Sequence, residues 1–137
     1  MSRRTDQRRA AVFALYQSAV TGRELDAVLE PGATRFTRAL AHAADDRADE
    51  LDALVERHAR GWSLERIAPL ERAIMRVALL EMLHPDAAPA DTPIPPEGAI
   101  DEAVELAKTY SGTDAPGFVN GILAAVHREI GHNRATS

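Results

Sequence analysis

The sequence predicts an all-α fold, and three observations support this prediction. Hydrophobic residues make up 45% of the 137 residues but aromatic residues only 4%, so the core must be aliphatic. An alanine-rich aliphatic composition favours helix over sheet. Apolar residues recur every three or four positions in several segments, and no alternation of period two persists. The length is sufficient for one domain with its own core.

The N-terminal half is expected to contain two long helices. Helical spacing predicts the first over about 6–21, and Gly22 is a stop signal for it. The Pro-Gly pair within 30–32 predicts a loop. Apolar residues then step by three and four over 36–58, which predicts a single amphipathic helix. Arg47 interrupts its apolar stripe, with an aliphatic stem that can lie along the core.

The middle of the chain is expected to hold the central helix. Residues 62–67 are typical of a short helix with Ser63 as its N-cap. Pro69 suits the first turn of the next helix, where a missing N–H costs little. Residues 70–83 are apolar on nearly every face, so this helix should be buried on most sides.

The C-terminal third is predicted to hold a proline-rich loop and two more helices. Five of the eight prolines fall between Pro85 and Pro96, so residues 85–98 should form an exposed, stiff loop. Helices are expected over 100–110 and 116–130. Residues 1–5 and 131–137 are expected to be flexible ends.

Composition and motifs argue against several classes of protein. The chain has no Cys, so it has no disulfide framework and no thiolate metal site. No apolar run approaches the ~20 residues of a membrane span, and no signal-peptide core follows the N-terminal arginines, which points to the cytoplasm. We find no phosphate loop, nucleophile elbow or dinucleotide fingerprint. We therefore expect neither catalysis nor a cofactor or metal ion.

The charge distribution is more informative than the net charge of −5, which by itself argues against general nucleic-acid binding. Within the first nine residues a single acid, Asp6, accompanies four arginines: Arg3, Arg4, Arg8 and Arg9. A basic tip on an acidic body can attract an anionic polymer at one place. Guanidinium groups pair with phosphate, but terminal arginines can also serve solubility alone, and charge does not decide between the two.

Three sequence blocks, in this order and spacing, resemble the NusB family of bacterial transcription antitermination factors. The first is the arginine-rich segment that runs into Ala14-Leu15-Tyr16. The second is Leu70-Glu71-Arg72-Ala73-Ile74-Met75-Arg76, followed by Leu80-Glu81-Met82. The third pairs Ile100-Asp101-Glu102-Ala103-Val104-Glu105-Leu106-Ala107-Lys108 with Phe118-Val119-Asn120-Gly121-Ile122-Leu123.

The resemblance implies a single helical domain made of two small three-helix halves. It also implies binding of a short single-stranded RNA element, boxA, including that of ribosomal RNA transcripts. The implied protein partner is NusE, a small ribosomal-subunit protein. With NusE, such a protein joins a complex on RNA polymerase that reads through terminators. No catalysis is implied, and family members occur as monomers and as homodimers.

The resemblance assigns roles to particular residues. It implies RNA contacts by the basic segment and by two residues near the last helix: Arg3, Arg4, Arg8, Arg9, Asp114 and Phe118. A base could stack on the Phe118 ring, although core packing is an equal interpretation. Asp114 is equally suited to cap the last helix. The implied NusE contacts are Tyr16, Glu71 and Arg76, with a buried anchor whose hydroxyl reaches water as the alternative for Tyr16.

The chain departs from the family pattern at three places. Asp6 and Gln7 stand where Arg and Ala are usual, and Gly117 stands where Lys is frequent. These changes remove positive charge, and the proline-rich loop is longer than usual. Two alternatives stay open: a helical interaction module that no longer binds RNA, and a fragment of a ribosomal-RNA cytosine methyltransferase, although no methyl-donor-binding unit follows in this chain.

Overall fold

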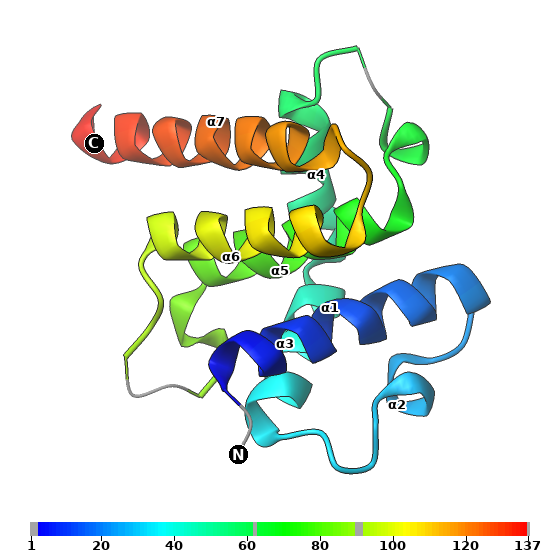
Figure 1. Ribbon diagram of the computed structural model, residues 1–137. Coiled ribbons are helices and arrows are strands. Elements are labelled where there is room, and N and C mark those ends of the chain that lie inside the picture. Colours follow the sequence, from blue (N-terminus) through cyan, green and yellow to red (C-terminus); the bar gives the residue numbers. More distant parts are fainter. Residues whose placement is uncertain (1–2, 62, 90–91, 137) are drawn as a thin grey trace.

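The computed structural model describes residues 3–61, 63–89 and 92–136, and these residues form helices without any strand (Figure 1). The predicted all-α class is therefore confirmed. The elements in chain order are α1 (Arg4–Thr21), α2 (Leu25–Val28), α3 (Arg35–Asp46), α4 (Ala48–His58), the 3₁₀ turn η1 (Leu64–Arg66), α5 (Pro69–Leu83), the 3₁₀ turn η2 (Pro85–Ala87), α6 (Pro96–Tyr110) and α7 (Ala115–Thr136).

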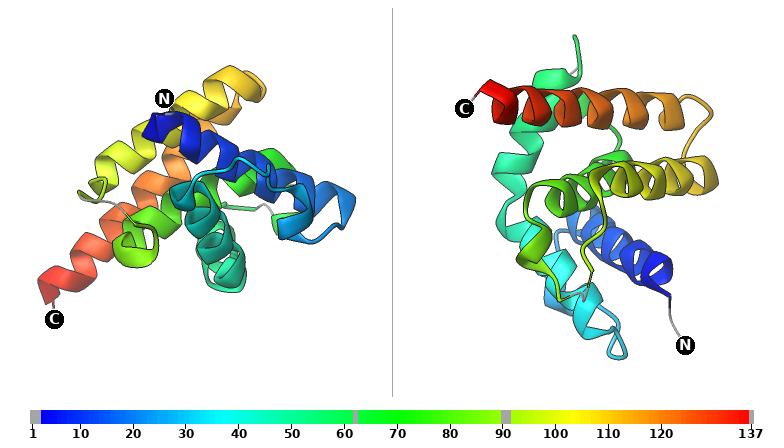
Figure 2. Two further views of the ribbon diagram at one scale, coloured as in Figure 1. Left: turned by 90° about the horizontal axis from the view of Figure 1, so that it is seen from below. Right: turned by 90° about the vertical axis from the view of Figure 1, so that its left-hand side faces the viewer.

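Helix α5 is the centre of the fold, as its apolar pattern predicts. It packs against α1, α3, α4, α6 and α7. Figures 1 and 2 show α1 on one side of α5, with α6 and then α7 on the other. Met75, Leu79 and Leu80 are completely buried along it. One aliphatic core therefore serves both the N-terminal and the C-terminal helices, with α5 shared between them.

The single long helix expected over 36–58 is wrong, because the chain turns at Arg47. Its backbone (φ −106°, ψ 18°) ends α3, and α4 begins in a new direction (Figures 1 and 2). Asp45 and Asp46 lie at the C-terminal end of α3, where the helix dipole disfavours acids. Asp49 and Glu50 lie in the first turn of α4, where it favours them. This charge pattern, rather than the apolar spacing, marks the break.

The segment before α5 is a 3₁₀ turn instead of the expected short helix. Leu64–Arg66 form η1, and the Ser63 side chain makes no capping hydrogen bond. Trp62, where that helix was expected to begin, lies outside the described residues. Ile67 is 2% exposed and anchors the turn to the core. Pro69 occupies the first turn of α5, as predicted.

The proline-rich segment is shorter and better packed than the exposed loop that the sequence predicts. It contains the turn η2, and α6 begins at Pro96 because proline is tolerated in the first turn of a helix. Ala88 is buried, and Ile94 packs against the core. A Cβ on Gly98 would lie 2.9 Å from Ile94 Cγ1, so a larger residue there would have to displace the Ile94 side chain.

The helical ends extend further than the sequence predicts. Helix α1 already includes Arg4, and it ends at Gly22 as expected, with a φ of 73°. Helix α7 extends to Thr136, past Gly131, which does not take up a left-handed conformation. A glycine inside a helix costs about 1 kcal/mol, which is too little to end a helix still packed on the core through Ile130. Within the described residues, no helix is long and apolar enough to span a bilayer.

Candidate nucleic-acid interface

The structure divides the four N-terminal arginines into two that are exposed and two that pair with carboxylates. Arg3 and Arg4 are exposed. The Arg4 guanidinium carbon lies 4.0 Å from the centroid of the Phe36 ring, a cation–π contact. Arg4 Nη1 also donates to Gln7 Oε1 (3.0 Å), and Nη2 donates to the Pro89 carbonyl (3.4 Å). Arg4 is thus held in place at the surface.

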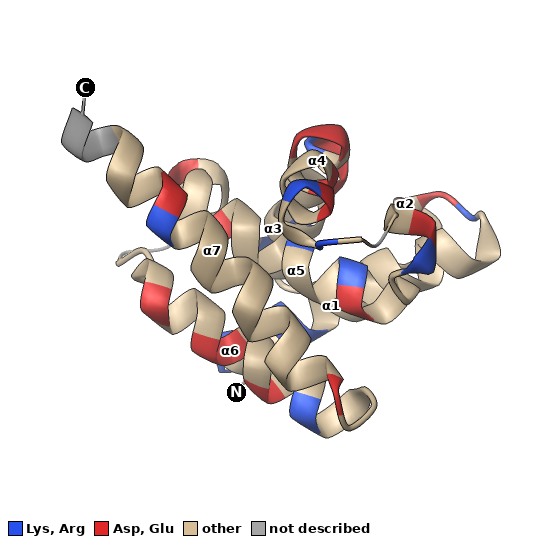
Figure 3. Ribbon diagram, turned by 90° about the horizontal axis from the view of Figure 1, so that it is seen from above, with Lys and Arg blue, Asp and Glu red and all other residues tan. Residues whose placement is uncertain are grey.

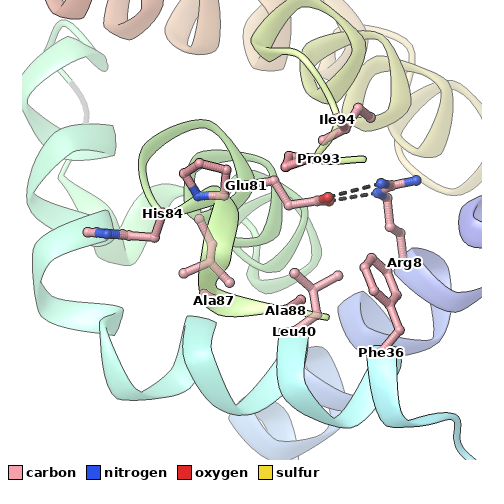
Figure 4. A pocket seen from close by; sticks show the side chains of 11 residues that line it. Arg8, Phe36, Leu40, Glu81, His84, Ala87, Ala88, Pro93 and Ile94 are labelled. Atoms are coloured by element: carbon pink, nitrogen blue, oxygen red, sulfur yellow. Dashed lines mark hydrogen bonds and ion pairs between the residues drawn. The ribbon is translucent and has the colours of Figure 1, made fainter. Parts of the chain in front are cut away.

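Arg8 does not have the open guanidinium that the sequence leads us to expect. Its side chain is 10% exposed, and it forms a two-pronged ion pair with Glu81, Nε to Oε1 at 2.7 Å and Nη2 to Oε2 at 3.0 Å (Figure 4). Its Nη1 lies 3.6 Å from Glu102 Oε1. Two carboxylates therefore already surround this cation, so we remove Arg8 from the set of proposed phosphate contacts.

Arg9 is partly neutralised by its neighbour. Its Nη2 lies 3.0 Å from Asp6 Oδ1, and 41% of the Arg9 side chain is exposed. Arg9 also borders a groove of about 600 Å³ between α1 and α6. Three carboxylates line that groove: Asp101, Glu102 and Glu105. Their charge opposes the entry of phosphate, so the basic segment is favourable to RNA mainly at Arg3 and Arg4.

A second cluster lies where η1, the start of α5 and the start of α7 meet. These elements form a groove of about 320 Å³ that is lined by Arg66, Ile67, Ala68, Glu71, Asp114, Ala115 and Phe118. It brings together Asp114 and Phe118, both expected to contact RNA, with Glu71, expected to contact NusE. The Phe118 ring is half-buried and packs partly on the core. Arg66 is a residue that sequence analysis missed.

The charged side chains of this groove are not used to stabilise the fold. Arg66, Glu71 and Asp114 make no hydrogen bond or ion pair, through their side chains, with any residue that the structure describes. Most other candidate site residues with a charge do make such contacts. Arg66 and Asp114 are exposed and Glu71 is half-buried, so water can solvate these charges beside the Phe118 ring.

One of the three residues expected to form the NusE face, Arg76, is engaged in an ion pair. Arg76 makes a two-pronged pair with Asp52, with distances of 2.6 and 2.5 Å, and both side chains are mostly buried. The hydrogen bonds that Arg76 donates to Asp52 raise the pKa of Arg76, so this residue is a charged link between α4 and α5. Glu71 is five residues away, about 140° around the helix. Tyr16 is half-buried on α1.

The two candidate RNA clusters lie at opposite ends of α5. Glu81, which holds Arg8, is near its C-terminal end, and Glu71 is near its start. Ten residues of helix separate them by about 15 Å. Figure 1 shows the same arrangement, with the start of α1 and the start of α7 on different sides of the molecule. Figure 3 shows acidic residues along α4 and α6, together with basic residues on several helices.

The model of the NusB family matches residues 5–128 of the chain. A transcription antitermination protein NusB from Rubrobacter xylanophilus is 39% identical over 140 aligned positions, which cover 95% of this chain and 93% of that protein. Another protein of that name, from Symbiobacterium thermophilum, is 37% identical and covers 93% of this chain and 90% of its own length. The chain belongs to the NusB family.

Solved structures are similar to the chain over almost its whole length. T. maritima NusB has a TM-score of 0.81 and 29% identity, covering 93% of this chain and 92% of its own. The NusB in a complex of antitermination factors NusB and NusE with double-stranded RNA has a TM-score of 0.77 and 23% identity, covering 92% and 96%. At that identity, the second likeness concerns the fold alone.

Proposed function

We propose that the protein is a transcription antitermination factor that binds boxA-type single-stranded RNA together with NusE and acts without catalysis. Membership of the family supports the class of function, since both relatives from Rubrobacter and Symbiobacterium carry the name of antitermination proteins. The observation that carries the proposal is the groove around Phe118, with its uncommitted charged groups. Its site of action is then the transcription complex of RNA polymerase, in the cytoplasm.

RNA contacts are expected at two places. Arg3 and Arg4 offer exposed guanidinium groups for phosphate oxygens, and Arg4 is positioned by Phe36 and Pro89. At the far end of α5, the Phe118 ring offers a face on which an unstacked base can lie. Because the chain carries a net charge of −5, we expect the strand to be held at these two ends rather than along the whole body.

We propose NusE as the protein partner, since the solved complex contains a NusB together with NusE. Of the three residues assigned to this contact, Tyr16 suits it as a half-buried ring with a polar tip. Arg76 is occupied by Asp52, and Glu71 opens into the Phe118 groove. Tyr16 and Glu71 therefore stay in the proposed NusE face.

The direct test compares RNA binding with and without NusE. We expect a boxA-like single strand to bind more tightly when NusE is present, measured by fluorescence anisotropy at fixed salt, with a scrambled strand of the same composition as the control. Binding of NusE without any preference over the scrambled strand would favour the interaction module instead. The comparison is informative because Arg8 and Arg9 already pair with carboxylates of the same chain.

Neutralising the two exposed arginines should weaken RNA binding and flatten its salt dependence. For single strands the slope of log affinity against log salt changes by about 0.7 for each phosphate that is no longer neutralised, so Arg3→Ala with Arg4→Ala should reduce it by about 1.4. The matched control is Arg23→Ala, an exposed arginine after α1. An unchanged slope in the double variant would reject these residues as phosphate contacts.

A further inference from the structure

The guanidinium group of Arg4 is held by contacts from three parts of the chain. It lies over the Phe36 ring of α3, it donates to Gln7 Oε1 of α1 at 3.0 Å, and it donates to the Pro89 carbonyl between η2 and α6 at 3.4 Å. Its neighbour Arg3 makes no side-chain hydrogen bond or ion pair with any residue that the structure describes. Of the two exposed arginines, only Arg4 therefore has a side chain that the fold holds in one place.

Gln7 connects Arg4 to a fixed point of the structure. Its Oε1 also accepts a hydrogen bond from Thr34 Oγ1 (2.9 Å), and its backbone carbonyl accepts one from Thr37 Oγ1 (3.0 Å). Thr34 is the N-cap of α3, and its Oγ1 accepts from the N–H of Thr37, a residue that is 2% exposed. Figure 1 shows the start of α1 beside the start of α3. The amide that holds Arg4 is thus itself anchored on a buried helix start.

An amide oxygen holds a cation without cancelling its charge. Arg8, one turn further along α1, shows the contrast, because its partner Glu81 is a carboxylate at 2.7 Å that neutralises it. Gln7 is neutral, so Arg4 keeps its full positive charge at the surface. The hydrogen bonds to Gln7 and Pro89 use only some of the N–H groups of the guanidinium, and the others remain for a phosphate oxygen.

We propose that Gln7 is a positioning residue for the phosphate contact of Arg4, which it orders on the protein surface before RNA arrives. The inference rests on the RNA-binding function proposed above, and it adds a residue that need not touch the RNA itself. A side chain that is already ordered loses less conformational entropy on binding. Arg4 should therefore contribute more to the affinity than Arg3, although both carry the same charge.

The order of the Arg4 side chain is measured by ¹⁵N relaxation of its Nε–H group in the protein without RNA. In the wild-type protein, Arg4 should be more ordered than Arg3. Gln7→Met keeps the length of the side chain but removes the acceptor, so it should lower the order of Arg4 towards that of Arg3. Gln7→Glu retains an acceptor and should preserve the order. Gln17→Met, at an exposed glutamine of the same helix, is the matched control.

The effect on binding is measured with a boxA-like strand and NusE over a series of salt concentrations. Gln7→Met should weaken binding about 2- to 12-fold, the cost of ordering one long side chain, and leave the salt slope unchanged because Arg4 keeps its charge. Gln7→Glu should instead reduce the slope by up to about 0.7, because its carboxylate competes with phosphate for Arg4. In an Arg4→Ala background, Gln7→Met should have no further effect.

A purely structural role for Gln7 gives a different result. If Gln7 only stabilised the junction of α1 and α3, Gln7→Met would weaken binding equally with and without Arg4, and this outcome would overturn the inference. So would an Arg4 side chain as mobile as that of Arg3 in the wild-type protein. Thermal unfolding verifies that each variant is folded. A wild-type protein that binds no strand with NusE present rejects the proposed function, whereas the relaxation measurement still decides whether Gln7 orders Arg4.

Discussion

Replacement of Glu81 by alanine is expected to lower the free energy of unfolding by about 3–5 kcal/mol, because it leaves the Arg8 guanidinium buried without its main partner. The two side chains are each 10% exposed and share two short hydrogen bonds. Glu102, at 3.6 Å from Arg8 Nη1, compensates only in part. Urea unfolding followed by circular dichroism measures the change.

An exposed ion pair is the matched control for this prediction. Glu105 pairs with Lys108 at 3.3 Å on the surface of α6, with side chains 69% and 59% exposed. Glu105→Ala should cost less than about 1 kcal/mol. The paired change Arg8→Met with Glu81→Leu should restore most of the stability, since an apolar pair needs no neutralisation. Similar losses for Glu81→Ala and Glu105→Ala would contradict the assignment of Arg8 to the core.

Replacement of Phe118 by alanine is expected to weaken RNA binding by about 1–3 kcal/mol, or 5- to 150-fold, because the stacked base has no ring to lie on. Phe118→Trp should keep the affinity, because the larger ring still offers a stacking face. Binding of the boxA-like strand in the presence of NusE is the measurement. Since the ring also packs partly on the core, the alanine variant must first be shown to be folded. Wild-type affinity in a folded Phe118→Ala protein would exclude stacking on this ring.

The neighbouring residue allows a change in the opposite direction. Gly117 directly precedes Phe118, and a Cβ placed there meets no atom within 4 Å beyond its chain neighbours and its own helix backbone. Gly117→Lys should therefore fit without rearrangement and strengthen RNA binding by adding a positive charge beside Phe118. Gly117→Gln, with a side chain of similar length and no charge, separates this effect from the gain in helix propensity.

The helices could be predicted because apolar residues recur at helical spacing along the chain. The exact ends of the helices depend on other interactions. The apolar face of α5 is visible in any helical projection of residues 70–83, and the structure buries it as expected. The break at Arg47 has no proline or glycine, so apolar spacing alone passes over it. The four-residue helix α2 is too short to show a period, and it forms where Leu25 and Leu29 reach the core.

The candidate site could be predicted only in part, because its residues acquire their roles from distant partners. Arg4 and Arg8 are one helical turn apart and look equivalent in the sequence. Glu81, 73 positions further along the chain, makes Arg8 part of the core and leaves Arg4 at the surface. Asp52 does the same for Arg76. No sequence pattern marks Arg66 as a site residue, since only the packing of η1 beside α7 brings it close to Phe118.

The separation of the two clusters along α5 makes the proposed interaction bivalent. Each end by itself offers few contacts, so a strand gains affinity chiefly when its second attachment becomes intramolecular. The length of RNA between the two attachment points then matters as much as the nucleotides themselves. Because a packed α-helix does not stretch, spacing becomes a source of selectivity: insertion of a few nucleotides between the two points would uncouple them without altering a single contact.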